Sequence, residues 1–216
     1  MKDIFIVGED DVTKEIIRVL VSKYAPNLRI KRAEPLRGSQ LKGMIGAYNN
    51  LSESIPVVLL EDLDTEDCAP SAKKKLLNGL TQKEDFIVNI AVDEAEAWLY
   101  ADAEGLASYL RVPIESIPQA KPMRMGGPRA RMEVDTNQKT SMHLTKELIF
   151  HSTDSTLIKQ IASSDGRCKG KEYNPAILPF IQNMWNPENA RLRSYSLDSS
   201  IKRIVRLNEK YAGVID

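Results

Sequence analysis

Carboxylates crowd the end of one apolar segment of the chain. Residues 55–60 are mostly aliphatic. Acids then follow at Glu61, Asp62, Asp64, Glu66 and Asp67. Acids so close together repel one another unless a cation lies among them. Mg²⁺ takes carboxylate oxygens and keeps several waters for a phosphate-bearing substrate. The spacing therefore indicates a divalent metal site, with a solvated acidic loop that only caps the next helix as the open alternative.

Two further apolar segments also end in acids. Residues 4–7 lead into Glu9, and residues 86–92 lead into an acidic run that includes Glu94 and Glu96. Parallel strands buried on both faces have this uninterrupted apolar character. Their carboxyl ends share the edge at which open α/β sheets bind ligands. We therefore expect the acids to converge on a metal, although Glu9 alone could also be an acid favoured by the N-terminus of the following helix.

The remaining pattern predicts the elements that position these acids. Strands are expected at residues 4–7, 28–33, 57–60 and 86–92. Helical periodicity follows the first three strands. Four more helical stretches are expected near residues 141–150, 156–162, 176–185 and 197–211. The expected fold is α/β, with helices on both faces of the sheet and a mostly helical C-terminal extension.

Basic residues gather in the second half of the chain. Residues 112–139 are rich in proline and glycine, which predicts a long irregular segment. Within it, Arg129 and Arg131 belong either to a flexible basic lid over nucleic acid or to a linker. A second basic cluster lies farther along, at Arg167, Lys169 and Lys171. Glycines in that stretch let backbone amides approach a phosphate, but a charged surface turn explains it equally well.

Composition narrows the class of protein. The 216 residues are 42% hydrophobic and 28% charged, with 30 basic and 30 acidic side chains. This is typical of a soluble globular protein, and the zero net charge gives no global field that would attract nucleic acid. The two cysteines have neither metal-site spacing nor a disulfide framework. We see no signal peptide and no apolar run of the roughly 18 residues that span a membrane, so we expect a cytoplasmic protein.

Several of these residues resemble a known family. Gly8-Glu9 after the first strand and Asp62-Leu-Asp64 after a later one are similar to the signature of Toprim domains. The run Glu94-Ala-Glu96-Ala-Trp98 and the stretch Lys169-Gly-Lys-Glu-Tyr-Asn-Pro175 resemble a family of Toprim-like bacterial proteins. Members of that family occur beside ABC-type or OLD-like ATPases in defence loci.

The resemblance implies a domain organisation and a set of roles. Residues 1–110 would form a Toprim-like Rossmannoid domain, residues 111–140 an irregular basic loop, and residues 141–216 a helical part that packs on the domain. Mg²⁺ or Mn²⁺ would be bound by Glu9, Asp62 and Asp64, with Glu66 as an additional acid and Glu94 and Glu96 at a second metal. Lys169 and Lys171 would assist catalysis, and the contacts to nucleic acid would come from Arg129, Arg131, Arg167, Lys169 and Lys171.

The expected function is that of a metal-dependent nuclease acting on DNA or RNA. It would be the effector subunit of an anti-phage system, working with an ABC- or OLD-like ATPase partner, and a homodimer or a complex is expected rather than a monomer. The alternative is a non-catalytic Toprim-fold subunit that docks onto an ATPase or another partner. A primase- or topoisomerase-like activity is the third option.

Overall fold

The computed structural model describes the chain except residues 36–37, 65, 125–128, 164–168, 171 and 214–216, and the side chains of residues 38 and 39. The chain divides into two compact units. The first consists of Met1–Ala91 and Asp198–Asp216, and the second of Val92–Leu197. This division differs from the expected one, because the last helix belongs mostly to the first unit and because the second unit begins directly after the fourth strand.

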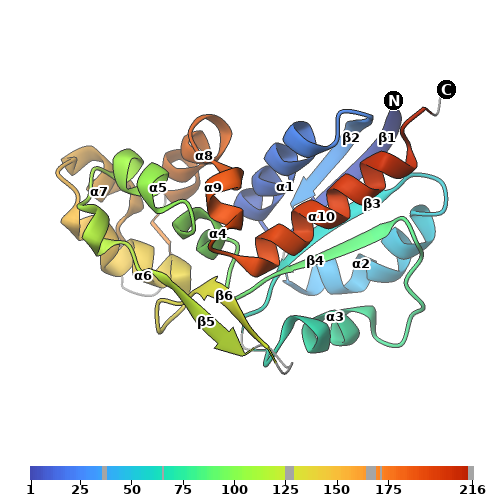
Figure 1. The fold of residues 1–216 in the computed structure, drawn as a ribbon, viewed down its shortest axis with the longest axis horizontal. Helices are drawn as coiled ribbons and strands as arrows, with labels where there is room; N and C mark the ends of the chain where they lie inside the picture. Colours follow the sequence, from blue (N-terminus) through green and yellow to red (C-terminus); the bar gives the residue numbers. More distant parts are fainter. Residues whose placement is uncertain (36–37, 65, 125–128, 164–168, 171, 214–216) are drawn as a thin grey trace. The chain divides into compact units, whose positions relative to one another are not determined.

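A four-stranded parallel sheet forms the centre of the first unit (Figure 1). Its strands are β1 (Lys2–Gly8), β2 (Leu28–Pro35), β3 (Val57–Asp62) and β4 (Phe86–Ala91). Their spatial order is β2-β1-β3-β4. All four expected strands are therefore present. The aliphatic residues Val57, Val58, Leu59 and Leu60 are fully buried, as expected for a strand covered on both faces.

Helices cover both faces of this sheet, which makes the unit an α/β fold consistent with a Rossmann-like arrangement (Figure 1). The helices are α1 (Asp11–Tyr24), α2 (Gly38–Leu51), α3 (Ala69–Leu77) and α10 (Tyr195–Lys210). Gly8 lies against the first turn of α1. Gly8 is paired with Leu60 of β3, and Leu60 is paired with Asn89 of β4. Asn89 accepts a hydrogen bond from Arg203 Nε of α10 at 3.0 Å, so α1 and α10 share one face of the sheet.

The second unit is mostly helical. Its elements are α4 (Glu96–Tyr100), α5 (Ala103–Leu110), a 3₁₀ turn (Ile114–Ser116), β5 (Ala120–Arg124), β6 (Ala130–Val134), α6 (Thr140–Lys146), a second 3₁₀ turn (Leu148–His151), α7 (Ser155–Ile161), α8 (Tyr173–Asn183) and α9 (Pro187–Arg191). The expected helical stretches after residue 140 are confirmed. The segment expected to be irregular instead contains an antiparallel hairpin of β5 and β6.

Indole groups and a buried acid organise the interior of the second unit. Trp98 is fully buried and donates from Nε1 to Ser196 Oγ at 2.8 Å. Trp185 Nε1 donates to the Trp98 carbonyl at 3.2 Å. The Glu133 side chain, also fully buried, accepts hydrogen bonds from Ser194 and Ser196.

None of the described helices combines the length and the apolar character that a membrane crossing requires.

Candidate functional site

The carboxyl ends of β1 and β3 form the most promising site in the first unit. From β1 the chain proceeds to β2 on one side, whereas β3 pairs with β1 on the other. The direction of strand addition therefore reverses between β1 and β3. In open α/β sheets, ligands bind in the crevice outside the strand ends at such a switch point. Glu9 directly follows β1, and Glu61 and Asp62 are the last two residues of β3.

A glycine and a capping box fix the turn that carries Glu9. A Cβ on Gly8 would lie 2.6 Å from Thr13 Oγ1 and even closer to the backbone nitrogen of Lys14, so only glycine allows β1 to approach α1 this closely. Asp10 caps α1 by accepting from Thr13 N at 2.8 Å, and Thr13 Oγ1 accepts from Asp10 N at 2.8 Å. Glu9 is therefore held between a strand and a capped helix.

Glu61 is the acid that the strand geometry brings to the side of Glu9. Gly8 is paired with Leu60, so Glu9, which follows β1, and Glu61 lie at the same end of neighbouring strands, and the charge of Glu9 acts on the Glu61 carboxyl. Successive side chains leave a strand in opposite directions, so Asp62 leaves β3 on the other side from Glu61.

The electrostatic environment of Glu61 is unfavourable to a negative charge. Burial and the charges of Glu9 and Asp64 together raise the pKa of Glu61 to about 7, while the Lys42 ammonium group opposes them. Glu61 Oε2 is buried and has no hydrogen-bond partner among the described residues. A buried carboxylate oxygen without a donor is costly, and a cation would remove that cost.

Glu61 and Asp64 border a cavity of about 420 Å³. Its lining combines acids with lysines and apolar groups, from Lys42, Glu61, Asp62, Leu63, Asp64, Glu66, Ala72, Lys75, Leu76 and Asn78. Asp64 has a φ of 52°, a left-handed conformation that is uncommon outside glycine and is tolerated by aspartate. The carboxylate of Glu66 forms an ion pair with Lys75. Glu66 therefore lies at the cavity, but with its charge already balanced.

The oxygen ligands at this site are of the type that a hard divalent cation prefers. Among the residues that the structure describes, no three Asp, Glu, His or Cys side chains gather closely enough to hold a metal. Mg²⁺, however, is usually held by only one or two carboxylates, with waters and substrate phosphate as its other ligands. The proximity of Glu9 and Glu61 and the buried Oε2 of Glu61 fit that requirement.

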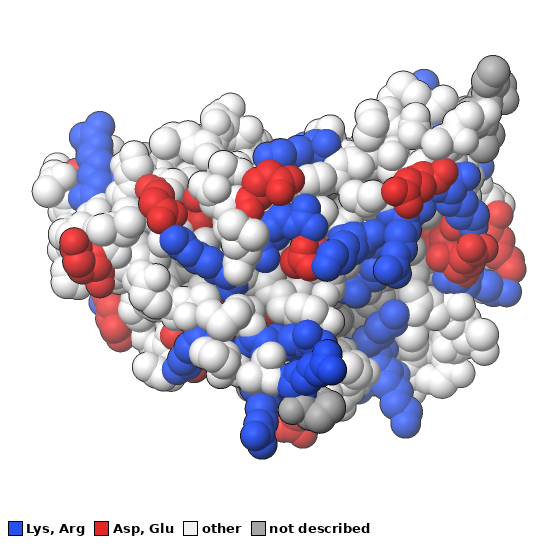
Figure 2. Space-filling model, viewed as in Figure 1, with Lys and Arg blue, Asp and Glu red and all other residues white. Residues whose placement is uncertain are grey.

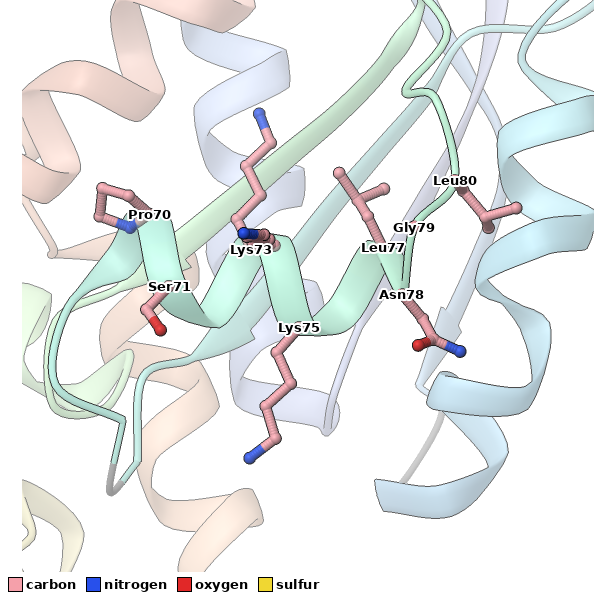
Figure 3. Close-up of a pocket in the computed structure, with 9 residues that line it drawn as sticks. Pro70, Ser71, Lys73, Lys75, Leu77, Asn78, Gly79 and Leu80 are labelled. Carbon is pink, nitrogen blue, oxygen red and sulfur yellow. The ribbon is translucent and has the colours of Figure 1, made fainter.

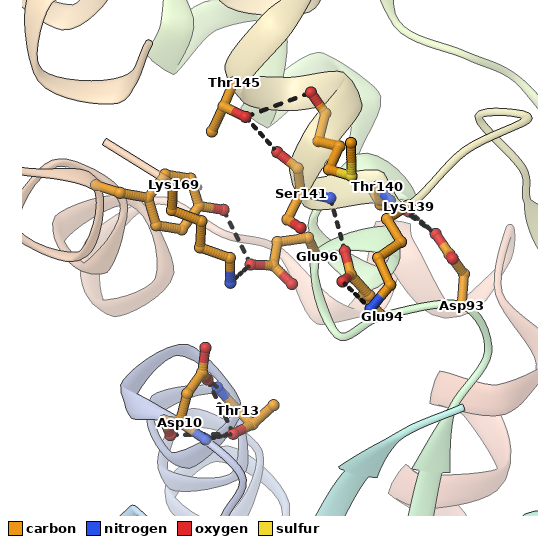
Figure 4. A network of polar contacts seen from close by, with 12 residues as sticks. Asp10, Thr13, Asp93, Glu94, Glu96, Lys139, Thr140, Ser141, Thr145 and Lys169 are labelled. Carbon is orange, nitrogen blue, oxygen red and sulfur yellow. Dashed lines mark hydrogen bonds and ion pairs between the residues drawn. The ribbon is translucent and has the colours of Figure 1, made fainter. Parts of the chain in front are cut away.

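The two acids expected at a second metal belong to the second unit, where they bind other side chains and backbone (Figure 4). Glu94 accepts a hydrogen bond from Ser141 N at 2.8 Å and lies 3.5 Å from Lys139 Nζ. Glu96 is 1% exposed and accepts from Lys169 Nζ at 2.6 Å and from Tyr173 OH at 3.0 Å. These contacts hold segments of the second unit together, and a metal-binding role for either acid stays a prediction.

The expected basic residues fall into three situations. Lys169 forms the ion pair with Glu96 and lies 4.9 Å from the centre of the Tyr173 ring. Arg167 and Lys171 lie outside the described residues. Arg131 lies over the Tyr195 ring at 4.3 Å, and Arg129 is exposed next to β6. The roles in phosphate or nucleic-acid binding assigned to these residues stay predictions.

The lysines of α3 do not form one patch. They border a shallow open groove along this helix, and Lys73 and Lys75 leave it in opposite directions (Figure 3). Burial and the charge of Arg203 lower the pKa of Lys73. Lys75 pairs with Glu66 at the acidic cavity, and hydrogen bonding to Glu66 raises its pKa. Only Lys75 of these two lysines therefore belongs to the candidate site.

Sequence reasoning noted Glu61 among the acids but did not select it, and it did not consider Lys42. The alternation of side chains along β3 could have shown that Glu61 and Asp62 point to opposite faces. Comparison with protein-family models, with curated proteins and with solved structures finds no match for this chain.

Proposed function

We propose that the acids at the carboxyl ends of β1 and β3 hold a divalent cation and that this unit cleaves phosphodiester bonds in nucleic acid, as a Toprim-like nuclease would. The observation that carries the proposal is the buried Oε2 of the Glu61 carboxyl. It lies at the switch point of the sheet and has no donor among the described residues, and burial and the charge of Glu9 raise the pKa of this carboxyl.

The residues that would hold Mg²⁺ or Mn²⁺ are Glu9 and Glu61, and the Asp-Leu-Asp pattern implies Asp62 or Asp64 as a further ligand. When bound, such an ion supplies charge stabilisation at the phosphate and lowers the pKa of a bound water. The Gly8 turn positions Glu9 between β1 and α1. Lys42 and Lys75, which line the same cavity, supply positive charge for a phosphate group.

The experiment that tests the proposal is cleavage of plasmid and of single-stranded DNA and RNA with Mg²⁺ or Mn²⁺. Wild type is compared with Asp64→Asn and with a matched control, Glu115→Gln, which changes an exposed acid of the second unit. We expect metal-dependent cleavage by wild type and the control, with loss in Asp64→Asn. Full activity in Asp64→Asn together with full activity in Asp62→Asn would contradict the proposal.

A non-catalytic role is the second candidate, and one observation favours it: no three metal-binding side chains gather among the described residues. In that case the acidic cavity would serve to dock a partner, for which the resemblance suggests an ABC- or OLD-like ATPase. Co-purification with that ATPase in the absence of any cleavage would support this candidate. Asp64→Asn should weaken binding of the ATPase if Asp64 lies on the docking surface. It should leave this binding unchanged if Asp64 lies outside that surface.

A further inference from the structure

The hairpin of β5 and β6 carries a concentration of positive charge. Lys and Arg side chains gather over these two strands (Figure 2). On the described part of the hairpin the cations are Lys121, Arg124, Arg129 and Arg131. The single acid on either strand, Glu133, is fully buried. Lys121 forms an ion pair with Asp135, just beyond β6, at 2.7 Å. The positive charge of the hairpin therefore rests mainly on its arginines, although the chain as a whole has no net charge.

The base of the hairpin is anchored firmly in the second unit. Glu133 accepts from Ser194 Oγ at 2.7 Å and from Ser196 N at 2.6 Å, and Val134 is 1% exposed. Arg131 lies on the Tyr195 ring. An isolated two-stranded hairpin is marginally stable in water, and these contacts with the rest of the second unit stabilise it.

One face of the hairpin is left open to solvent. Directly opposed residues share a face, so Pro122 and Met132 lie on the same side as Arg124 and Ala130. All four are exposed, Met132 by 40%. The other face carries Met123 and Arg131, which are only half-exposed. The open face thus combines apolar groups with Arg124, and Arg129 follows at its edge.

We propose that this open face binds double-stranded DNA by entering the major groove, with Arg124 and Arg129 on the flanking phosphates. The proposal rests on the proposed function for its choice of nucleic acid as the ligand. The major groove of B-form DNA, about 12 Å wide, admits a two-stranded β-ribbon. Double-stranded RNA has a deep and narrow major groove that side chains cannot read. The geometry of the hairpin therefore selects duplex DNA over duplex RNA.

The test is fluorescence anisotropy of the full chain with a labelled 20-base-pair DNA duplex, the RNA duplex of the same sequence, and single-stranded DNA. All measurements contain EDTA, so that binding is measured without cleavage. The variant is Arg124→Ala/Arg129→Ala, and the charge-matched control is Lys23→Ala/Lys159→Ala, which removes two exposed lysines from other helices. Circular dichroism checks that each variant keeps its fold.

We expect the hairpin variant to bind duplex DNA at least tenfold more weakly than wild type and control. The slope of log K against log salt should become shallower by about 1.8, which corresponds to two lost phosphate contacts. The same variant should have a much smaller effect on binding to duplex RNA and to single strands. Absence of duplex binding by wild type, an unchanged affinity in the variant, or an equal loss for all three nucleic acids would overturn the proposal.

The two proposals fail in different ways. Duplex binding that depends on the hairpin, without metal-dependent cleavage, would reject the nuclease and leave the DNA-binding face standing. Metal-dependent cleavage of duplex DNA with the same KM in wild type and hairpin variant would reject the DNA-binding face and leave the nuclease standing.

Discussion

Two glutamates, the half-buried Glu61 of the first unit and the fully buried Glu133 of the second, have similar acidity and opposite surroundings. Burial raises the pKa of both Glu61 and Glu133 to about 7. Glu133 accepts three hydrogen bonds, from the hydroxyl groups of Ser194 and Ser196 and from the Ser196 backbone. Glu61 instead faces the charges of Glu9 and Asp64, and its Oε2 has no donor among the described residues.

The difference shows how a structural acid can be separated from a candidate ligand. A raised pKa alone does not distinguish the two glutamates. What distinguishes them is whether the protein supplies donors to the carboxyl oxygens. Where it supplies them, as at Glu133, the acid holds a hairpin in place. Where it supplies more acids, as at Glu61, the site is strained in the absence of a cation.

The largest expected effect is on catalysis. Glu61→Gln keeps the size of the side chain but removes one negatively charged candidate metal ligand from the cavity. We expect metal-dependent cleavage to fall by roughly 100- to 1000-fold, the loss typical of removing one electrostatic contact to a transition state. Initial rates on plasmid measure the effect, with Glu115→Gln as the control. A wild-type rate in Glu61→Gln, together with inactivity of Asp62→Asn, would assign the metal to the opposite face of β3.

The next effect tests whether the acids of the second unit are structural. Lys169→Met removes the cation that pairs with the carboxylate of Glu96, which is 1% exposed. The hydrogen bond from Tyr173 OH remains. Removing one member of a buried pair costs about 3 kcal/mol at the lower end of the usual range, and the partial exposure of Lys169 justifies the lower end.

Chemical denaturation measures this loss. The double variant Lys169→Met/Glu96→Gln should recover most of it, because no unpaired charge is then buried. A loss of cleavage in Lys169→Met without a loss of stability would instead favour the predicted catalytic role of this lysine.

The raised pKa of Glu133 predicts that the free energy of unfolding depends on pH. Its pKa of about 7 in the folded protein lies above the ordinary value of 4.5, so the folded protein binds more protons between these values than the unfolded chain. The free energy of unfolding therefore falls as the pH rises from 4.5 to 7, by roughly 2 to 3 kcal/mol. Glu133→Gln should remove this contribution, so it should be more stable than wild type at pH 8 and similar at pH 4.5. Urea denaturation of wild type and Glu133→Gln at both pH values measures this contribution. An equal difference in the free energy of unfolding between the two proteins at pH 4.5 and pH 8 would contradict the raised pKa of Glu133.

The smallest expected effect is stabilisation by metal alone. At a free Mg²⁺ concentration ten times Kd, the folded state should gain about 1.4 kcal/mol. Glu61→Gln should lose this gain, whereas Glu133→Gln should keep it. Thermal unfolding with and without Mg²⁺ measures both. A shift of the same size in Glu61→Gln would place the metal elsewhere.

The sequence allowed the sheet and its acidic edge to be predicted, because the strands are uninterrupted apolar runs and acids follow them directly. It did not allow the choice between Glu61 and Asp62. That choice depends on the pairing of Gly8 with Leu60, which is a contact between residues far apart in the chain.

The composition of residues 112–139 did not allow the hairpin to be predicted. Proline and glycine in residues 112–139 predict an irregular segment, but Pro122 lies in a two-stranded ribbon, where each strand is an edge strand that tolerates proline. The boundary after Ala91 was also missed, because it depends on the return of α10 to the sheet.

That return has a consequence for synthesis on the ribosome. The first unit is made of two separated pieces, Met1–Ala91 and Asp198–Asp216, and Ile201, Ile204 and Leu207 of α10 are buried in it. The second unit is contiguous, so all of its residues emerge before the first unit can be completed. A nascent chain would therefore hold its acidic strand ends on an unfinished sheet until α10 has been translated.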